Sequence, residues 1–163
     1  MVSQSSTLQR RVESGHLDVA LVKDFAGGTR GRLVRRDRLV WAAVARSRGV
    51  QERPVPLVMY HAPSGSRSRA TQALDEAGIG YRITCTVRDV TGLLAAVRAE
   101  LGITTFASSL VPEDLVEVPP SAGLPELGEI DLVLLTNPRS PAGPVNALST
   151  AILASVNPIR GMR

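Results

Sequence analysis

Short runs of apolar residues alternate along the chain with segments in which apolar residues recur at helical spacing. The short runs predict buried strands, and they cover residues 17–22, 36–44, 56–62, 81–87, 103–106, 115–118 and 129–136. Helical spacing predicts helices over residues 6–14, 64–78, 89–101 and 144–156. Because strands alternate with helices, we expect an α/β protein with a mainly parallel sheet and helices on both of its faces.

Capping residues mark the ends of several predicted helices. Ser64 and Asp89 are expected N-caps, because their side chains can accept hydrogen bonds from free backbone N–H groups. Gly15, Gly78 and Gly102 are each expected to end a helix.

Two of the predicted helices carry an apolar stripe that we expect to be buried. The stripe of the helix that starts at Asp89 comprises Val90, Leu93, Leu94, Val97 and Leu101. The stripe of the last helix comprises Val145, Leu148, Ile152 and Val156.

The composition is that of a globular protein with one core or two small lobes. The chain has 163 residues, of which 44% are hydrophobic, and a domain of this size buries roughly 70% of its unfolded surface. No apolar run approaches the roughly 20 residues of a membrane span, and the first residues lack the apolar segment of a secretory signal. We therefore expect a cytoplasmic protein without a membrane partner.

The positive net charge does not by itself predict a nucleic-acid partner. The formal charge is +4, but only 3% of the residues are aromatic, too few for a platform on which bases could stack. Basic residues are densest between Arg30 and Arg53, where Asp37 and Glu52 interrupt them. We interpret this run as a solvated face, with an anion-binding or DNA-facing role as the alternative.

Motifs for catalysis or cofactor binding are missing from the sequence. Two histidines and one cysteine supply too few ligands for a zinc site. The chain lacks G-x-S-x-G, G-x-x-x-x-G-K-[ST] and G-x-G-x-x-G. We expect no enzymatic activity, no cofactor and no metal. His16 is expected at the surface, whereas His61 is either a ligand contact or an ordinary loop residue.

The segment PSGSR, residues 63–67, is the strongest candidate for a binding site. Free N–H groups at the start of a helix, together with two serines, favour an anion such as a carboxylate. A plain helix cap is the alternative. In parallel sheets ligands bind beyond the carboxyl ends of strands, which here are expected at residues 23–24, 61–66, 86–88, 107–109 and 136–137.

Five segments of the chain carry a resemblance through the order in which they follow one another. They are LQRRVESGHLDVALV, LVRRDRLVWAA, RPVPLVMYHAPSGSRSRATQALDEAGI, TVRDVTGLLAAVRAELGITTFASSLVP and EIDLVLLTNP. In this order they resemble the effector-binding domain of LysR-type transcriptional regulators, and the resemblance covers roughly residues 5–155.

The resemblance implies a two-lobed, periplasmic-binding-protein-like (type 2) fold with an effector cleft. Residues 1–44 and 129–163 would form the first lobe, and residues 45–128 the second. The ligand would be a small polar or anionic effector. The implied effector-binding residues are Lys23, Asp24, His61, Pro63, Ser64, Ser66, Thr86 and Phe106.

Two parts of the family's regulators have no counterpart in this sequence. These are the N-terminal winged helix-turn-helix and the first β-α-β unit of the first lobe, so we expect an N-terminally truncated effector-binding domain that does not bind a defined DNA sequence. Two assemblies stay open, a homodimer and a heterodimer with a full-length regulator. The alternative functions are a cytoplasmic enzyme on the same fold and a non-sensing fragment that pairs with an intact regulator.

Overall fold

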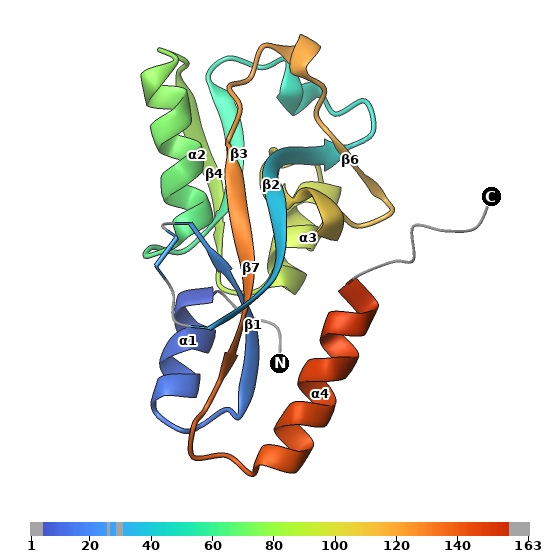
Figure 1. Ribbon diagram of the computed structural model, residues 1–163. Helices are drawn as coiled ribbons and strands as arrows, with labels where there is room; N and C mark the ends of the chain where they lie inside the picture. The colour runs from blue at the N-terminus through green and yellow to red at the C-terminus, as the bar shows by residue number, and fades with distance from the viewer. Residues whose placement is uncertain (1–4, 26, 29–30, 157–163) are drawn as a thin grey trace, which may run out of the picture. The chain divides into compact units, whose positions relative to one another are not determined.

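The computed structural model describes residues 5–156 except 26, 29 and 30, and it divides into two compact units (Figure 1). Unit 1 consists of Asp37–Ile130, and unit 2 consists of Ser5–Arg36 together with the chain from Asp131 onward. Strands β2 (Arg32–Val44) and β7 (Glu129–Thr136) each run from one unit into the other.

Unit 2 is built around an antiparallel strand pair that one helix covers. Strand β1 (Val19–Asp24) pairs with β7, with Val19 opposite Thr136 and Asp24 opposite Asp131. Helix α1 (Ser5–Glu13) packs against the pair through apolar side chains that alternate along both strands. The buried residues of this cluster are Leu8, Val12, Ala20, Val22, Val133 and Leu135.

Unit 1 contains a parallel strand pair and antiparallel pairs made by β2, which also has β7 as a hydrogen-bonded neighbour. Strand β3 (Val55–Tyr60), helix α2 (Gly65–Glu76) and strand β4 (Tyr81–Val87) follow one another, and β3 and β4 are parallel. Helix α3 (Val90–Arg98) leads to β5 (Thr104–Ala107) and then to the short β6 (Leu115–Glu117). Both β5 and β6 pair antiparallel with β2.

The expectation of a mainly parallel sheet is wrong, because the pairs β1–β7, β2–β5 and β2–β6 are all antiparallel. Parallel pairing needs a crossover, and α2 supplies one between β3 and β4. The partner of β1 is β7, which comes from the far end of the chain. The apolar run of β1 gave no information about whether this pairing is parallel or antiparallel. The strand is also placed at Val19–Asp24, two residues later than the run predicted.

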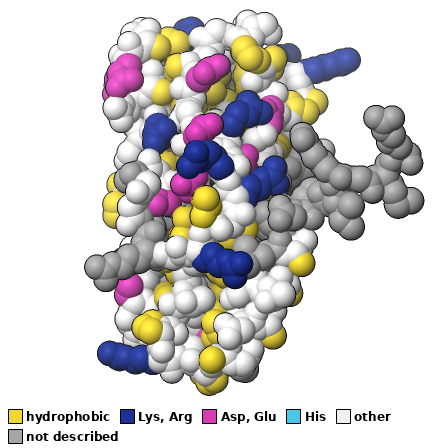
Figure 2. Space-filling view, viewed as in Figure 1, with side chains coloured by type: hydrophobic (Ala, Val, Ile, Leu, Met, Phe, Trp, Pro, Cys, Tyr) yellow, Lys and Arg dark blue, Asp and Glu magenta, His cyan; other side chains and the backbone are white. Residues whose placement is uncertain are grey.

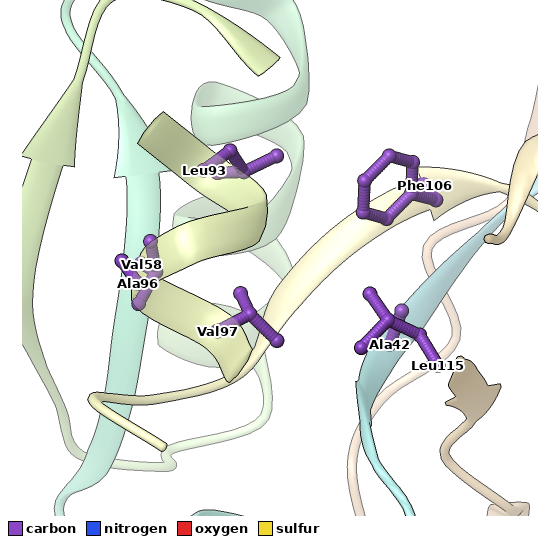
Figure 3. Packing of buried hydrophobic residues seen from close by; sticks show 7 residues of the cluster. All are labelled: Ala42, Val58, Leu93, Ala96, Val97, Phe106 and Leu115. Carbon is purple, nitrogen blue, oxygen red and sulfur yellow. The ribbon is translucent and has the colours of Figure 1, made fainter. Parts of the chain in front are cut away.

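One cluster of the core of unit 1 lies between α3 and neighbouring strands. Figure 3 shows seven buried residues of this cluster, which come from β2, β3, α3, β5 and β6. They are Ala42, Val58, Leu93, Ala96, Val97, Phe106 and Leu115. This cluster holds together the strands from which the candidate site is built.

Glycines end α1 and α2 as predicted, but α3 ends differently. Gly15 and Gly78 adopt the left-handed conformation, with φ of 79° and 66°. After α3 the left-handed residue is Glu100 (φ 56°), not Gly102. A Cβ on Gly102 would lie 2.5 Å from the carbonyl oxygen of Pro56, so Gly102 is needed for close approach to β3.

Two leucines of the predicted apolar stripes are exposed instead of buried. Leu101 lies beyond the end of α3 and is 48% exposed. In α4 (Ala142–Val156) Leu148 is 51% exposed, whereas Ser149 is buried. Because α4 contains no charged residue, its sequence does not distinguish one face from another. The side chain of Val156 lies outside the described part of the chain.

Arginines of the basic run are partly compensated by neighbouring carboxylates. Arg36 pairs with Asp131 in unit 2, and Arg38 pairs with Glu117 in unit 1. On the face shown in Figure 2, Lys and Arg side chains lie among Asp and Glu side chains. This arrangement is that of a solvated surface with mixed charge.

Candidate functional site

The carboxyl ends of β3 and β4 lie at one edge of unit 1, because the two strands are parallel and Tyr60 pairs with Val87. The His61 N–H donates to the carbonyl of Val87 at 2.8 Å, which extends the pairing by one residue. Helices α2 and α3 both begin just beyond this edge. We call residues His61–Ser66 and Thr86–Asp89 the β3–β4 carboxyl edge.

Ser64 and Ser66 form a buried pair of hydroxyl groups at the start of α2. Ser64 is the N-cap, and its Oγ accepts a hydrogen bond from the Arg67 N–H at 3.4 Å. The two Oγ atoms lie 3.1 Å apart. The helix cap that the sequence offered as an alternative is therefore present.

His61, Pro63 and Thr86 are exposed at the same edge. The Nδ1 of His61 lies 2.7 Å from the carbonyl oxygen of Ala62. A carbonyl oxygen only accepts hydrogen bonds, so Nδ1 carries the proton in this arrangement. The structure thus brings together five of the sequence-predicted residues, three accessible and two buried.

Three residues in or directly beside this edge were not predicted as site residues: Asp89 within it, and Tyr60 and Arg67 next to it in the sequence. Arg67 donates from Nη1 to the carbonyl of Tyr60 at 3.2 Å, and the Asp89 carboxylate accepts from the Gly92 N–H at 2.8 Å. Burial, with a smaller contribution from the Asp89 carboxylate, raises the pKa of the Tyr60 hydroxyl to about 12. The sequence pattern identified Asp89 as a cap but gave no indication of its effect on Tyr60.

Phe106 lies in the core of unit 1 and is only 8% exposed (Figure 3). Its neighbours there include Leu93 and Val97 of α3. Packing accounts for this side chain, and a ligand could reach it only by displacing part of the core. The predicted effector contact of Phe106 is therefore not supported by its position.

Lys23 and Asp24 belong to unit 2, and their side chains point to opposite faces of β1. Asp24 shares the α1 face with Ala20 and Val22, and its carboxylate accepts from the N–H groups of Gly27 at 3.2 Å and of Gly28 at 3.0 Å. Burial lowers the pKa of the Lys23 ammonium below its ordinary value of 10.5.

A cavity of about 670 Å³ also lies within unit 2. Asp24 contributes to its wall, together with Gln9 and Glu13 of α1 and with residues at the end of β7. Lys23 is not among the lining residues, so the structure does not bring these two predicted site residues to one surface.

The described residues contain no group of three or more His, Cys, Asp or Glu side chains that could hold a metal ion. None of the helices in the described part of the chain is both long and apolar enough to cross a bilayer.

Residues 1–155 match the family model described as "LysR substrate binding domain". The HTH-type transcriptional regulator DgdR of Burkholderia cepacia is 26% identical over 135 residues, which cover 83% of this chain and 46% of DgdR. The chain spans about half the length of the curated relatives that it matches, 46% and 48%.

Solved structures show the same fold. The regulatory domain of Synechocystis PCC6803 CcmR, in complex with 2-PG, superposes with a TM-score of 0.62 at 12% identity, covering 96% of this chain and 81% of that one. The effector-binding domain of QuiR in complex with shikimate gives a TM-score of 0.59 at 14% identity and covers 93% of this chain and 78% of that one.

Proposed function

The chain belongs to the LysR substrate-binding domain family, and from this membership we propose that it binds a small polar or anionic effector at the β3–β4 carboxyl edge. It is an effector-binding domain of the LysR type with a periplasmic-binding-protein-like (type 2) α/β fold. The residues that contact the effector and the chemical class of the effector are the proposal.

One observation carries the choice of this edge. Two helices begin there, but only α3 has a carboxylate as its N-cap, from Asp89. Helix α2 is capped by the neutral Ser64 and has no acidic residue in its first turn, and Arg67 lies in that turn. The N-terminus of α2 therefore retains its partial positive charge, which favours an anionic ligand.

His61, Pro63 and Thr86 would contact the effector, because they are exposed beside the start of α2. Ser64 and Ser66 would shape the site from beneath, since both are buried. Lys23 and Asp24 were suggested by the family resemblance alone, and because they belong to unit 2 they are not included in the site proposed here. Shikimate and 2-PG, bound by the two structural neighbours, are the first compounds to test.

The domain is proposed to sense its effector without chemical turnover, in the cytoplasm, as part of transcription regulation. Specific DNA recognition is not proposed for this chain. Its partner is proposed to be another regulator subunit, either a second copy or a full-length protein.

Thermal unfolding with a panel of small carboxylates and phosphate esters, including shikimate, tests the site. At a hundredfold excess over Kd a ligand should stabilise the fold by about 2.7 kcal/mol. Thr86→Trp should abolish that shift, because it places a large side chain on the exposed edge. Arg82→Trp is the control, since Arg82 is also exposed on β4 but lies near the other end of the strand. An equal shift in both variants would place the ligand elsewhere.

A further inference from the structure

Lys23 is the only lysine of the chain, and it lies in β1 on the face that points away from α1. Its direct neighbour across the strand pair is Leu132, and Leu21 with its own partner Leu134 follows on the same face. Leu132 and Leu134 are each 2% exposed, so this part of the face is covered. The Lys23 side chain therefore leaves the backbone among apolar side chains.

No carboxylate compensates the charge of Lys23 within the described residues, where it forms no ion pair. The neighbouring acids of the strand pair, Asp24 and Asp131, lie opposite one another at positions that point to the other face. The neutral hydroxyl of Ser5, at the start of α1, accepts a hydrogen bond from the Lys23 backbone N–H at 2.9 Å. Helix α4, in the same unit, contains no charged residue.

These surroundings favour the neutral amine of Lys23 over its ammonium form. Burial lowers the pKa of the ammonium below 10.5. The neutral amine is the nucleophile toward carbonyl compounds, and desolvation in an apolar environment is one way in which proteins activate a lysine for this reaction. Lys23 is half-buried, so part of its side chain is accessible to a small molecule.

We propose that Lys23 is a covalent binding site for a small apolar aldehyde, which it would hold as a Schiff base. The neutral Nζ adds to the carbonyl carbon and forms a carbon–nitrogen bond. Loss of water then gives the C=N bond, and the carbonyl oxygen leaves in that water with both hydrogens of the amine. The step consumes no oxidant or reductant. Lys23 belongs to unit 2 and the β3–β4 carboxyl edge to unit 1, so the inference does not depend on the proposed function.

Reductive trapping measures this reaction at Lys23 directly. The full chain carrying Arg10→Lys is incubated at pH 7 with butanal and cyanoborohydride, which converts each Schiff base into a stable secondary amine. Arg10 is exposed in α1 and forms no ion pair within the described residues, so the substitution supplies an exposed lysine in the same molecule. Peptide mass mapping should show Lys23 modified about threefold or more faster than position 10, because a lower pKa leaves more neutral amine.

Three controls connect the rate at Lys23 with its folded surroundings. In urea that unfolds the chain, Lys23 and the lysine introduced at position 10 should react at equal rates. In the folded chain, the advantage of Lys23 should shrink as the pH approaches 10.5, the ordinary pKa of a lysine. Glyoxylate should give Lys23 a smaller advantage than butanal does, because its carboxylate would enter apolar surroundings.

Three results would overturn the proposal. They are modification of Lys23 at pH 7 no faster than that of position 10, an advantage of Lys23 that persists in urea, and equal selectivity with butanal and glyoxylate. Lys23→Arg should remove the adduct from this peptide while the thermal shift caused by an acid at the β3–β4 carboxyl edge stays unchanged. Thermal unfolding verifies that each variant folds. If Arg10→Lys does not fold, Arg48→Lys, which is exposed in unit 1, takes its place.

Discussion

At the scale of single residues, Tyr60 is a polar side chain held against an apolar core. It packs against the cluster that contains Val58 and Leu93, and the negative charge of the Asp89 carboxylate acts on its hydroxyl group. Both surroundings disfavour the phenolate, which explains the rise in pKa from 10.0 to about 12. The consequence is a stability that depends on pH above the ordinary titration range of tyrosine.

The sign of this dependence follows from the protons bound by each state. Above pH 10 the unfolded chain loses the Tyr60 proton while the folded chain keeps it, so the free energy of unfolding should fall as the pH rises from 10 to 12. Tyr60→Phe should remove this part of the slope. Urea unfolding of both proteins at pH 8 and pH 11 measures it. The lowered pKa of Lys23 changes the free energy of unfolding with pH in the opposite direction. Because Lys23 is present in both proteins, its contribution cancels in the comparison. If the free energy of unfolding changes with pH to the same extent in both proteins, the pKa of Tyr60 is not raised by folding.

At the scale of elements, the close approach of Gly102 to Pro56 fixes the distance between the segment after α3 and strand β3. Gly102→Ala should destabilise the fold by about 1–3 kcal/mol, because its Cβ would lie 2.5 Å from a backbone oxygen. Gly143→Ala is the matched control: Gly143 lies in α4, where a Cβ meets nothing within 4 Å. The control should be neutral or stabilising by up to about 1 kcal/mol. Chemical denaturation measures both, and equal effects would show that β3 yields to the added methyl group.

The existence and order of the elements could be predicted from the sequence, whereas the pairing directions could not. Residues 129–136 are a strand with the predicted bounds, and Ser64 and Asp89 cap their helices as expected. These features depend on neighbours in the chain. The direction of β1 depends on β7, more than a hundred residues away, and periodicity carries no information about it.

The candidate site could be predicted to a similar extent. The capping pattern placed Ser64 and Ser66 correctly at the start of a helix, because a cap is a local feature. Phe106 was predicted as an effector contact from the family resemblance, whereas in the structure its side chain is buried in the core of unit 1. A cavity of about 330 Å³ beside Trp41 in unit 1 was not predicted, because its walls come from three separate segments whose meeting is a property of the fold.

At the scale of the whole molecule, the chain is a domain of a family whose curated relatives here are about twice its length. The two compact units are joined through β2 and β7, and each unit has its own cluster of buried side chains. The central claim is that the β3–β4 carboxyl edge of unit 1 binds the effector.

Amide hydrogen exchange of the full chain, with and without the acid that most raises its unfolding temperature, tests this claim most directly. We predict that the ligand increases protection at residues 61–67 and 86–92, where α2 and α3 begin. Residues 117–120 and 124–129, elsewhere in unit 1, should change little. Protection that rises only outside the β3–β4 carboxyl edge, or a panel in which no acid stabilises the fold, would contradict the account.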